Sequence, residues 1–133
     1  MITVFADTGY YIALVNGKDE YHAQARAYTA AFQGAFLTSA WVILEFANHL
    51  SDEANRPLFL SLYDDLGKNK RVRILPAAQE DFDRGLELYR QRPDKDWSLT
   101  DCISMIQMKD HGLAEALTTD HDFEQAGFVR LLK

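Results

Sequence analysis

The stretch Ile2-Thr3-Val4-Phe5-Ala6-Asp7 decides the fold: it is a short apolar run that ends directly in an aspartate. Residues 2–6 predict a short buried strand. Further short apolar segments predict strands at residues 36–38, 72–75, 114–118 and 128–132. Helical segments separate these strands, and that alternation predicts an α/β fold with a parallel sheet covered on both faces.

The segments between the strands have the apolar spacing and end signals of helices. We expect helices at residues 8–15, 20–33, 39–50, 55–67, 78–91 and 99–111, and a helical turn at 120–126. Ser39 is a good N-cap for the third of them. The chain of 133 residues contains no repeat and no Pro/Gly-rich linker, so residues 1–133 are expected to form a single domain.

Composition narrows the class of protein. The net charge is −6, with 20 acidic and 14 basic residues, which argues against a general nucleic-acid binder with a basic surface. Two local basic patches, at residues 68–73 and 84–95, can still hold phosphates, although solvated surface charge is the commoner meaning of such patches. Cys102 is the only cysteine, and the sequence shows neither a secretory signal nor an apolar run long enough for a membrane span. We therefore expect a cytoplasmic protein with no membrane association.

Four carboxylates fall where a parallel sheet binds its ligands, beyond the carboxyl ends of the strands. Asp7 ends the first strand, and Asp120 follows the fourth strand after two threonines. Glu45 is the only charged residue in the apolar segment 40–47, inside the helix that begins at the end of the second strand. Asp101 precedes the apolar helical residues 102–106. Their common position predicts one acidic site.

Each of these acids also has an interpretation without function. Asp7 and Asp120 suit helix N-caps or Asx turns. Glu45 fits a polar helix stripe with Trp41, Asn48 and Asp52, and Asp101 fits a capping box with Ser98. The sequence segments alone leave these alternatives open.

A shared site would have a chemical consequence. Carboxylates about 5–6 Å apart repel by roughly 3 kcal/mol per pair at an effective dielectric constant of 20. Divalent cations compensate such repulsion, and oxygen ligands suit Mg²⁺ or Mn²⁺. These ions activate water and stabilise leaving oxygens in phosphoryl chemistry. The cluster therefore predicts metal-dependent phosphodiester hydrolysis.

Four segments resemble the PIN-domain ribonucleases, most closely the VapC-like toxins of type II toxin–antitoxin systems. They are Asp7-Thr8, Trp41-Val42-Ile43-Leu44-Glu45, residues 97–104 and residues 117–128, so the resemblance runs nearly end to end. It implies a three-layer α/β/α fold with a five-stranded parallel sheet. It also implies an RNA substrate and a cognate antitoxin protein, and we further expect a homodimer.

The resemblance also ranks the acids. Asp7 and Asp101 would be the principal Mg²⁺ or Mn²⁺ ligands, with Asp120 completing the metal shell directly or through water. Glu45 would orient the attacking water or hold a second ion. Thr8 and Ser98 would support these acids by hydrogen bonds, and Asp122 either adds charge to the site or caps the turn that follows.

Other interpretations of the same residues are weaker. A haloacid-dehalogenase-type phosphatase needs an aspartate where the chain has Gly9, and a receiver domain needs one where it has Leu75-Pro76. Cys102 as a nucleophile has no base placed beside it, and His121 fits a solvated turn. A non-catalytic PIN-like module that binds RNA or protein is the alternative that remains. Four tyrosines are expected in core packing, with a partner contact as the other option: Tyr10, Tyr11, Tyr21 and Tyr28.

Overall fold

Five parallel strands form the centre of the molecule in the computed structural model, which describes residues 1–133. The strands are β1 (Thr3–Ala6), β2 (Ala35–Ser39), β3 (Val72–Leu75), β4 (Glu115–Leu117) and β5 (Val129–Arg130), in the spatial order β3-β2-β1-β4-β5. Phe5 of β1 pairs with Leu37 of β2 and with Ala116 of β4. Because β1 is central, Asp7 leaves the sheet in the middle of its carboxyl edge.

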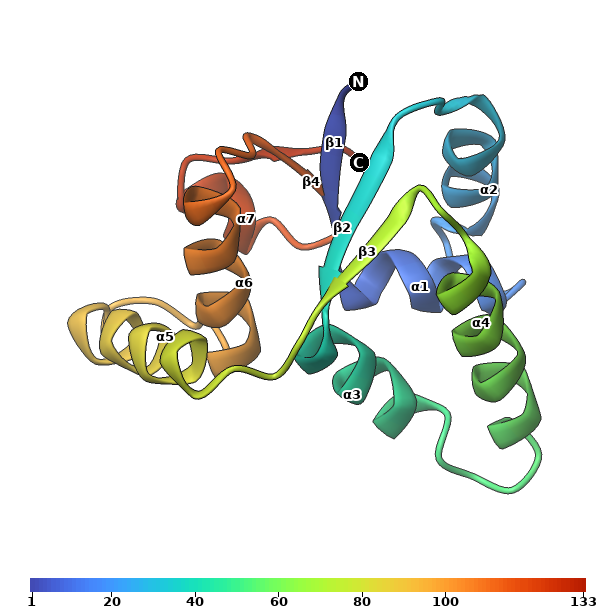
Figure 1. Cartoon of the computed structure of the whole chain (residues 1–133), viewed down its shortest axis with the longest axis horizontal. Coiled ribbons are helices and arrows are strands. Elements are labelled where there is room, and N and C mark those ends of the chain that lie inside the picture. Colours follow the sequence, from blue (N-terminus) through green and yellow to red (C-terminus); the bar gives the residue numbers. More distant parts are fainter.

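Helices cover both faces of this sheet (Figure 1). One layer consists of α1 (Thr8–Val15), α2 (His22–Ala31), α3 (Ala40–His49) and α4 (Arg56–Lys68), and the other of α5 (Gln79–Gln91), α6 (Leu99–Asp110) and α7 (Asp122–Gln125). The predicted α/β fold with three layers and a five-stranded parallel sheet is confirmed. None of the helices combines the length and the apolar character that crossing a membrane requires.

The core is apolar and aromatic, as burial on both faces of a parallel sheet requires. Tyr10 and Tyr11 are buried, and their rings pack on Phe36 and Phe46. Tyr21 and Tyr28 are partly buried against the same core. The expected core role of the four tyrosines is therefore confirmed.

The structure shortens some predicted elements. The helix expected from residue 20 begins at His22, because the Asp19 carboxylate accepts a hydrogen bond from the Tyr21 N–H and forms an Asx turn. The strand expected at 128–132 narrows to Val129–Arg130, and the one at 114–118 to Glu115–Leu117. Thr118 lies directly beyond β4: its carbonyl accepts the Leu132 N–H, and its hydroxyl donates to the Asp7 carboxylate and accepts the Asp120 N–H.

Candidate active site

A cavity of about 360 Å³ opens at the carboxyl edge of the sheet. All four predicted acids line it, together with two further aspartates, and Ile12 is its one hydrophobic wall residue. The acidic set is Asp7, Glu45, Asp96, Asp101, Asp120 and Asp122. The structure thus brings together residues from α1, α3, α6 and the loop after β4, as their positions at the strand ends predicted.

Asp7 stands at the N-cap position of α1 but makes no side-chain cap, so the capping interpretation does not account for it. The carboxylate is 4% exposed, and its Oδ2 accepts a hydrogen bond of 2.8 Å from the Thr118 hydroxyl. Its Oδ1 is buried without any hydrogen-bond partner. Burial, followed by the charges of Glu45 and Asp120, raises the pKa of Asp7 to about 6.

Asp101 forms the capping box and also lines the cavity. Its backbone N–H donates to Ser98 Oγ at 3.0 Å, and its Oδ2 accepts from the Ser98 N–H at 3.2 Å, which completes a capping box. The same carboxylate lines the cavity and is 8% exposed. Burial, with the charges of Asp7 and Asp120 next, raises the pKa of Asp101 to about 7.

Thr118 links the acids, and sequence reasoning did not single it out. Its buried hydroxyl donates to Asp7 and accepts the backbone N–H of Asp120 at 3.1 Å. Asp120 Oδ1 in turn accepts the backbone N–H of Asp122 at 2.9 Å. The only signal was the pair Thr118-Thr119 directly before Asp120. One hydroxyl therefore orients Asp7 and holds the loop that carries Asp120.

Glu45 is half-buried and lines the cavity, where its charge contributes to the raised pKa of Asp7. The other members of the alternative polar stripe lie elsewhere: Asn48 and Asp52 are exposed, and Trp41 packs on Phe82. Only Glu45 of that set enters the cavity. These positions favour the interpretation of Glu45 as a residue of the acidic cavity over its interpretation as part of a polar helix stripe.

Thr8 and Ser98, the expected supporting residues, both line the cavity. The Thr8 hydroxyl is buried without a hydrogen-bond partner, whereas Ser98 caps α6 and holds Asp101. Asp122, left open by the sequence, lines the cavity too, and burial and the Asp120 charge raise its pKa. Its carboxylate joins the site, while its backbone closes the Asx turn with Asp120.

The donor set suits a hard divalent cation, which carboxylate oxygens bind. Asp7 Oδ1 supports the fit of such a cation to this site. A buried carboxylate oxygen without a hydrogen-bond donor is energetically unfavourable unless a proton or a cation binds to it. A ligand atom from each of Asp120, His121 and Asp122 also lies within 4.8 Å of the others. His121 is exposed, as expected for a turn histidine.

Cys102 does not provide a nucleophile. Its thiol is buried, and burial together with the Asp101 charge raises its pKa to about 11, so it stays protonated at neutral pH. No thiolate is therefore available beside the acids.

The sequence profile of the PIN domain matches residues 4–129. The chain belongs to the PIN domain family. This PIN domain is 27% identical over 129 residues to the 23S rRNA-specific endonuclease VapC20 of Mycobacterium tuberculosis, covering 96% of the chain and 97% of that relative. The predicted resemblance is confirmed.

Solved structures share the fold of this PIN domain. The crystal structure of VapC20 from Mycobacterium tuberculosis, described as a sarcin-ricin-loop-cleaving toxin, superposes with a TM-score of 0.88 at 23% identity and covers 98% of this chain and 99% of that one. VapBC2 of Rickettsia felis, bound to a promoter DNA fragment, superposes with a TM-score of 0.67 at 12% identity, and the match covers 97% of each chain. FitAcB of Neisseria gonorrhoeae superposes with a TM-score of 0.67 at 17% identity, and the match covers 96% of this chain and 94% of that one.

Proposed function

We propose that this PIN domain is a metal-dependent endoribonuclease that hydrolyses RNA phosphodiester bonds as the toxin of a toxin–antitoxin pair. The observation that carries the proposal is the pair of buried carboxylates Asp7 and Asp101, whose pKa values lie near 6 and 7 and one of which keeps an unpartnered oxygen. Such a pair is unfavourable at neutral pH unless a cation compensates it. The likeness to an rRNA endonuclease adds the substrate class.

Each residue then has a stated task. Asp7 and Asp101 hold Mg²⁺ or Mn²⁺, and Asp120 completes the shell. A divalent cation in this position supplies charge stabilisation for the leaving oxygen and activation of water. Glu45, half-buried at the cavity wall, orients the attacking water and accepts its proton. Thr118 keeps the Asp7 carboxylate in one orientation.

Cleavage of a labelled RNA by the purified protein tests this proposal. We expect cutting with Mn²⁺ or Mg²⁺, none with a chelator, and a loss of at least about a thousandfold in Asp101→Asn, because a ligand and its charge disappear. Asp64→Asn is the matched control, since Asp64 is exposed on α4 and pairs with nothing. A wild-type protein that cuts no better than Asp101→Asn would establish the non-catalytic alternative instead.

The toxin role requires a cognate antitoxin, and an apolar groove supports a protein partner. The groove lies between α3 and α4, measures about 360 Å³ and is lined only by hydrophobic residues. Leu44 and Leu60 are 55% and 56% exposed there, which is unusual for a surface without a partner. Two of the similar structures, from Rickettsia felis and Salmonella typhimurium, are VapBC assemblies bound to DNA.

Expression of the chain in bacteria tests the toxin role. We expect growth arrest on induction, rescue by co-expression of the protein encoded next to it, and no arrest from Asp101→Asn. Leu44→Glu is expected to keep the arrest and lose the rescue, because a charge in the groove disfavours apolar docking. The expected homodimer is checked separately by sedimentation of the purified protein.

A further inference from the structure

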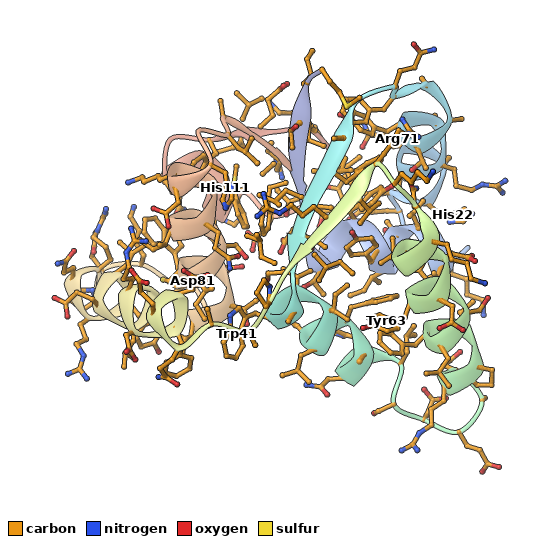
Figure 2. The ribbon with its side chains drawn as sticks, viewed as in Figure 1. His22, Trp41, Tyr63, Arg71, Asp81 and His111 are labelled. Carbon is orange, nitrogen blue, oxygen red and sulfur yellow. The ribbon has the colours of Figure 1, made fainter.

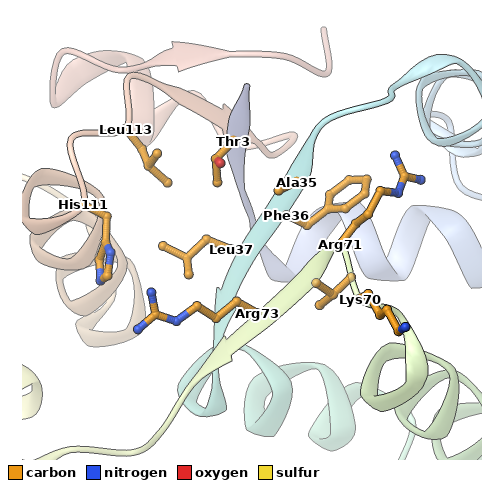
Figure 3. A pocket seen from close by; sticks show the side chains of 10 residues that line it. Thr3, Ala35, Phe36, Leu37, Lys70, Arg71, Arg73, His111 and Leu113 are labelled. Atoms are coloured by element: carbon orange, nitrogen blue, oxygen red, sulfur yellow. The ribbon is translucent and has the colours of Figure 1, made fainter. Parts of the chain in front are cut away.

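A second cavity, of about 250 Å³, opens at the amino ends of β1, β2 and β3 (Figure 3). Its lining includes Lys70, Arg71, Arg73 and His111 and contains no acidic residue, in a chain whose net charge is −6. We call it the amino-edge pocket. It shares no lining residue with the acidic cavity.

Two of these basic side chains are free to bind. Figure 3 shows Arg73, from β3, and His111, after α6, approaching one another over Leu37. Both residues are exposed, and neither side chain makes a hydrogen bond or ion pair. Asp110 precedes His111, but its carboxylate is already paired with Arg84, whose Nη2 lies 2.9 Å from Asp110 Oδ1. Asp110 is thus an acidic neighbour of His111, whereas no carboxylate forms an ion pair with Arg73.

Arg71 stabilises the rim instead. Its Nη1 donates to the carbonyls of Phe32 and Gly34, at 2.9 and 3.1 Å, and its guanidinium lies over the Phe36 ring. These bonds fix the chain where β2 and β3 begin. Leu37 and Leu113 leave an apolar floor beside the free cations. An apolar floor with exposed basic groups above it suits a phosphate joined to an apolar or planar moiety.

The length of α6 gives the distance between the amino-edge pocket and the acidic cavity. Asp101 lies in its first turn and His111 directly follows it, so ten residues of helical rise place them about 15 Å apart. A stacked nucleic-acid strand advances about 3.4 Å per nucleotide, so about four or five nucleotides span this distance. In Figure 2, His111 and Arg71 lie toward the opposite end of the sheet from Trp41, in the first turn of α3, which follows the carboxyl end of β2.

We propose that the amino-edge pocket is an RNA exosite, where Arg73 and His111 bind a phosphate of the substrate several nucleotides from the bond that is cut. This inference rests on the proposed ribonuclease activity. The acidic cavity repels phosphates, so the affinity for RNA has to come from cations placed elsewhere. Arginine suits this task because its fork of N–H donors matches phosphate oxygens.

Binding of fluorescent single-stranded RNA to the full chain, with chelator present to prevent cleavage, tests the exosite. The double variant Arg73→Gln, His111→Gln is expected to bind a 20-nucleotide RNA about tenfold more weakly, through the loss of charge-assisted contacts. The slope of log Kd against log salt is expected to fall by about 0.7, the value for one phosphate contact on a single strand. A four-nucleotide RNA, which offers fewer phosphates, is expected to bind the wild type more weakly than the 20-nucleotide RNA and to lose affinity in the double variant as well, because the exosite supplies its phosphate contact.

The matched control is Arg26→Gln, Arg90→Gln, which removes two exposed, unpaired cations on α2 and α5. Equal losses in both double variants, or an unchanged Kd, would overturn the exosite. In cleavage assays the exosite predicts a raised KM with kcat unchanged. If the wild type cuts no RNA at all, the ribonuclease proposal fails, and the binding experiment alone decides the exosite.

Discussion

At the carboxyl edge of the sheet, Asp7 and Asp101 are almost fully buried, joined to Thr118 and Ser98, and shifted in pKa. At the amino edge, Arg73 and His111 are exposed and bound to nothing. The first arrangement destabilises the fold when its charges form, because burial penalises them and they repel one another. The second is nearly free of cost, since water solvates both exposed side chains. Buried charges thus respond to pH and metal, and exposed ones to salt.

The sharpest expression of this difference is the pH dependence of stability without metal. In folded protein Asp7 and Asp101 release protons near pH 6 and 7, whereas in the unfolded chain they do so near 3.8. Their favourable contribution is therefore complete below about pH 4 and lost as pH rises through 7. We expect Asp7→Asn to raise the free energy of unfolding by about 3 kcal/mol at pH 8 and by little at pH 4. Urea unfolding with chelator present measures both values.

The amino edge supplies the control for that experiment. Arg73→Gln should change the free energy of unfolding by less than about 0.5 kcal/mol at either pH. If Asp7→Asn raised the free energy of unfolding at pH 8 no more than Arg73→Gln, the buried carboxylates would not destabilise the fold as inferred. With saturating Mn²⁺ the wild type should become more stable than Asp7→Asn, because only the wild type gains binding energy from the cation.

Next in size is the effect of Thr118, whose hydroxyl bonds both the Asp7 carboxylate and the Asp120 backbone. Thr118→Val removes the donor and keeps the shape, so we expect cleavage and Mn²⁺ affinity to fall together by about 10- to 100-fold. Thr118→Ser restores the hydroxyl and should recover most of both. A Thr118→Val protein that binds Mn²⁺ as tightly as wild type would show that Asp7 needs no partner to hold its orientation.

The helix α6 reaches from one edge of the sheet to the other, and Gly85 of α5 lets α5 pack closely against it. A Cβ at Gly85 would meet the side chain of Ile103 and come within 3.0 Å of its backbone N and Cα. Gly85→Ala should therefore push α5 from α6 and lower the free energy of unfolding by about 1–3 kcal/mol. Gly67→Ala, where a Cβ meets nothing within 4 Å, should instead stabilise α4 by up to about 1 kcal/mol. Equal signs for the two glycines in urea unfolding would contradict this packing account.

The smallest effect is expected from His121, a basic side chain at the acidic edge. It lies 3.9 Å from the Asp120 carboxylate and 3.6 Å from that of Asp122, and its side chain is 70% exposed. Exposed pairs of this kind contribute little, so His121→Gln should change Mn²⁺ affinity and kcat by less than about threefold. A tenfold loss of Mn²⁺ affinity, measured by calorimetric titration, would make His121 a metal ligand and add a histidine to the proposed acidic shell.

The sequence was informative where physical causes are local. Apolar runs and end signals located all five strands, and the rule for strand ends placed Asp7 and Asp120 at one edge. Thr118 was not predicted because its role depends on a side-chain orientation, and its neighbour Thr119 has the same chemistry. The roles assigned to the four acids stay predictions.

The amino-edge pocket was beyond sequence reasoning for another reason. Arg73 and His111 meet only because β3 lies at the sheet edge next to β2 and α6 ends above it. Strand order is a long-range property that local patterns do not contain. The basic patch at residues 68–73 was visible, but the histidine that completes the pocket lies about 40 positions further along the chain.

Asp7 meets Thr118 across 111 positions of sequence, and this has a consequence for how the protein is made. The ribosome delivers Asp7 long before β4, which pairs with β1, and Thr118 emerge. A nascent chain that stops earlier leaves β1 with a bare edge and Asp7 without its partner. A chain truncated before β4 therefore lacks both the pairing of β4 with β1 and the Asp7–Thr118 hydrogen bond, so it should not assemble the acidic cavity.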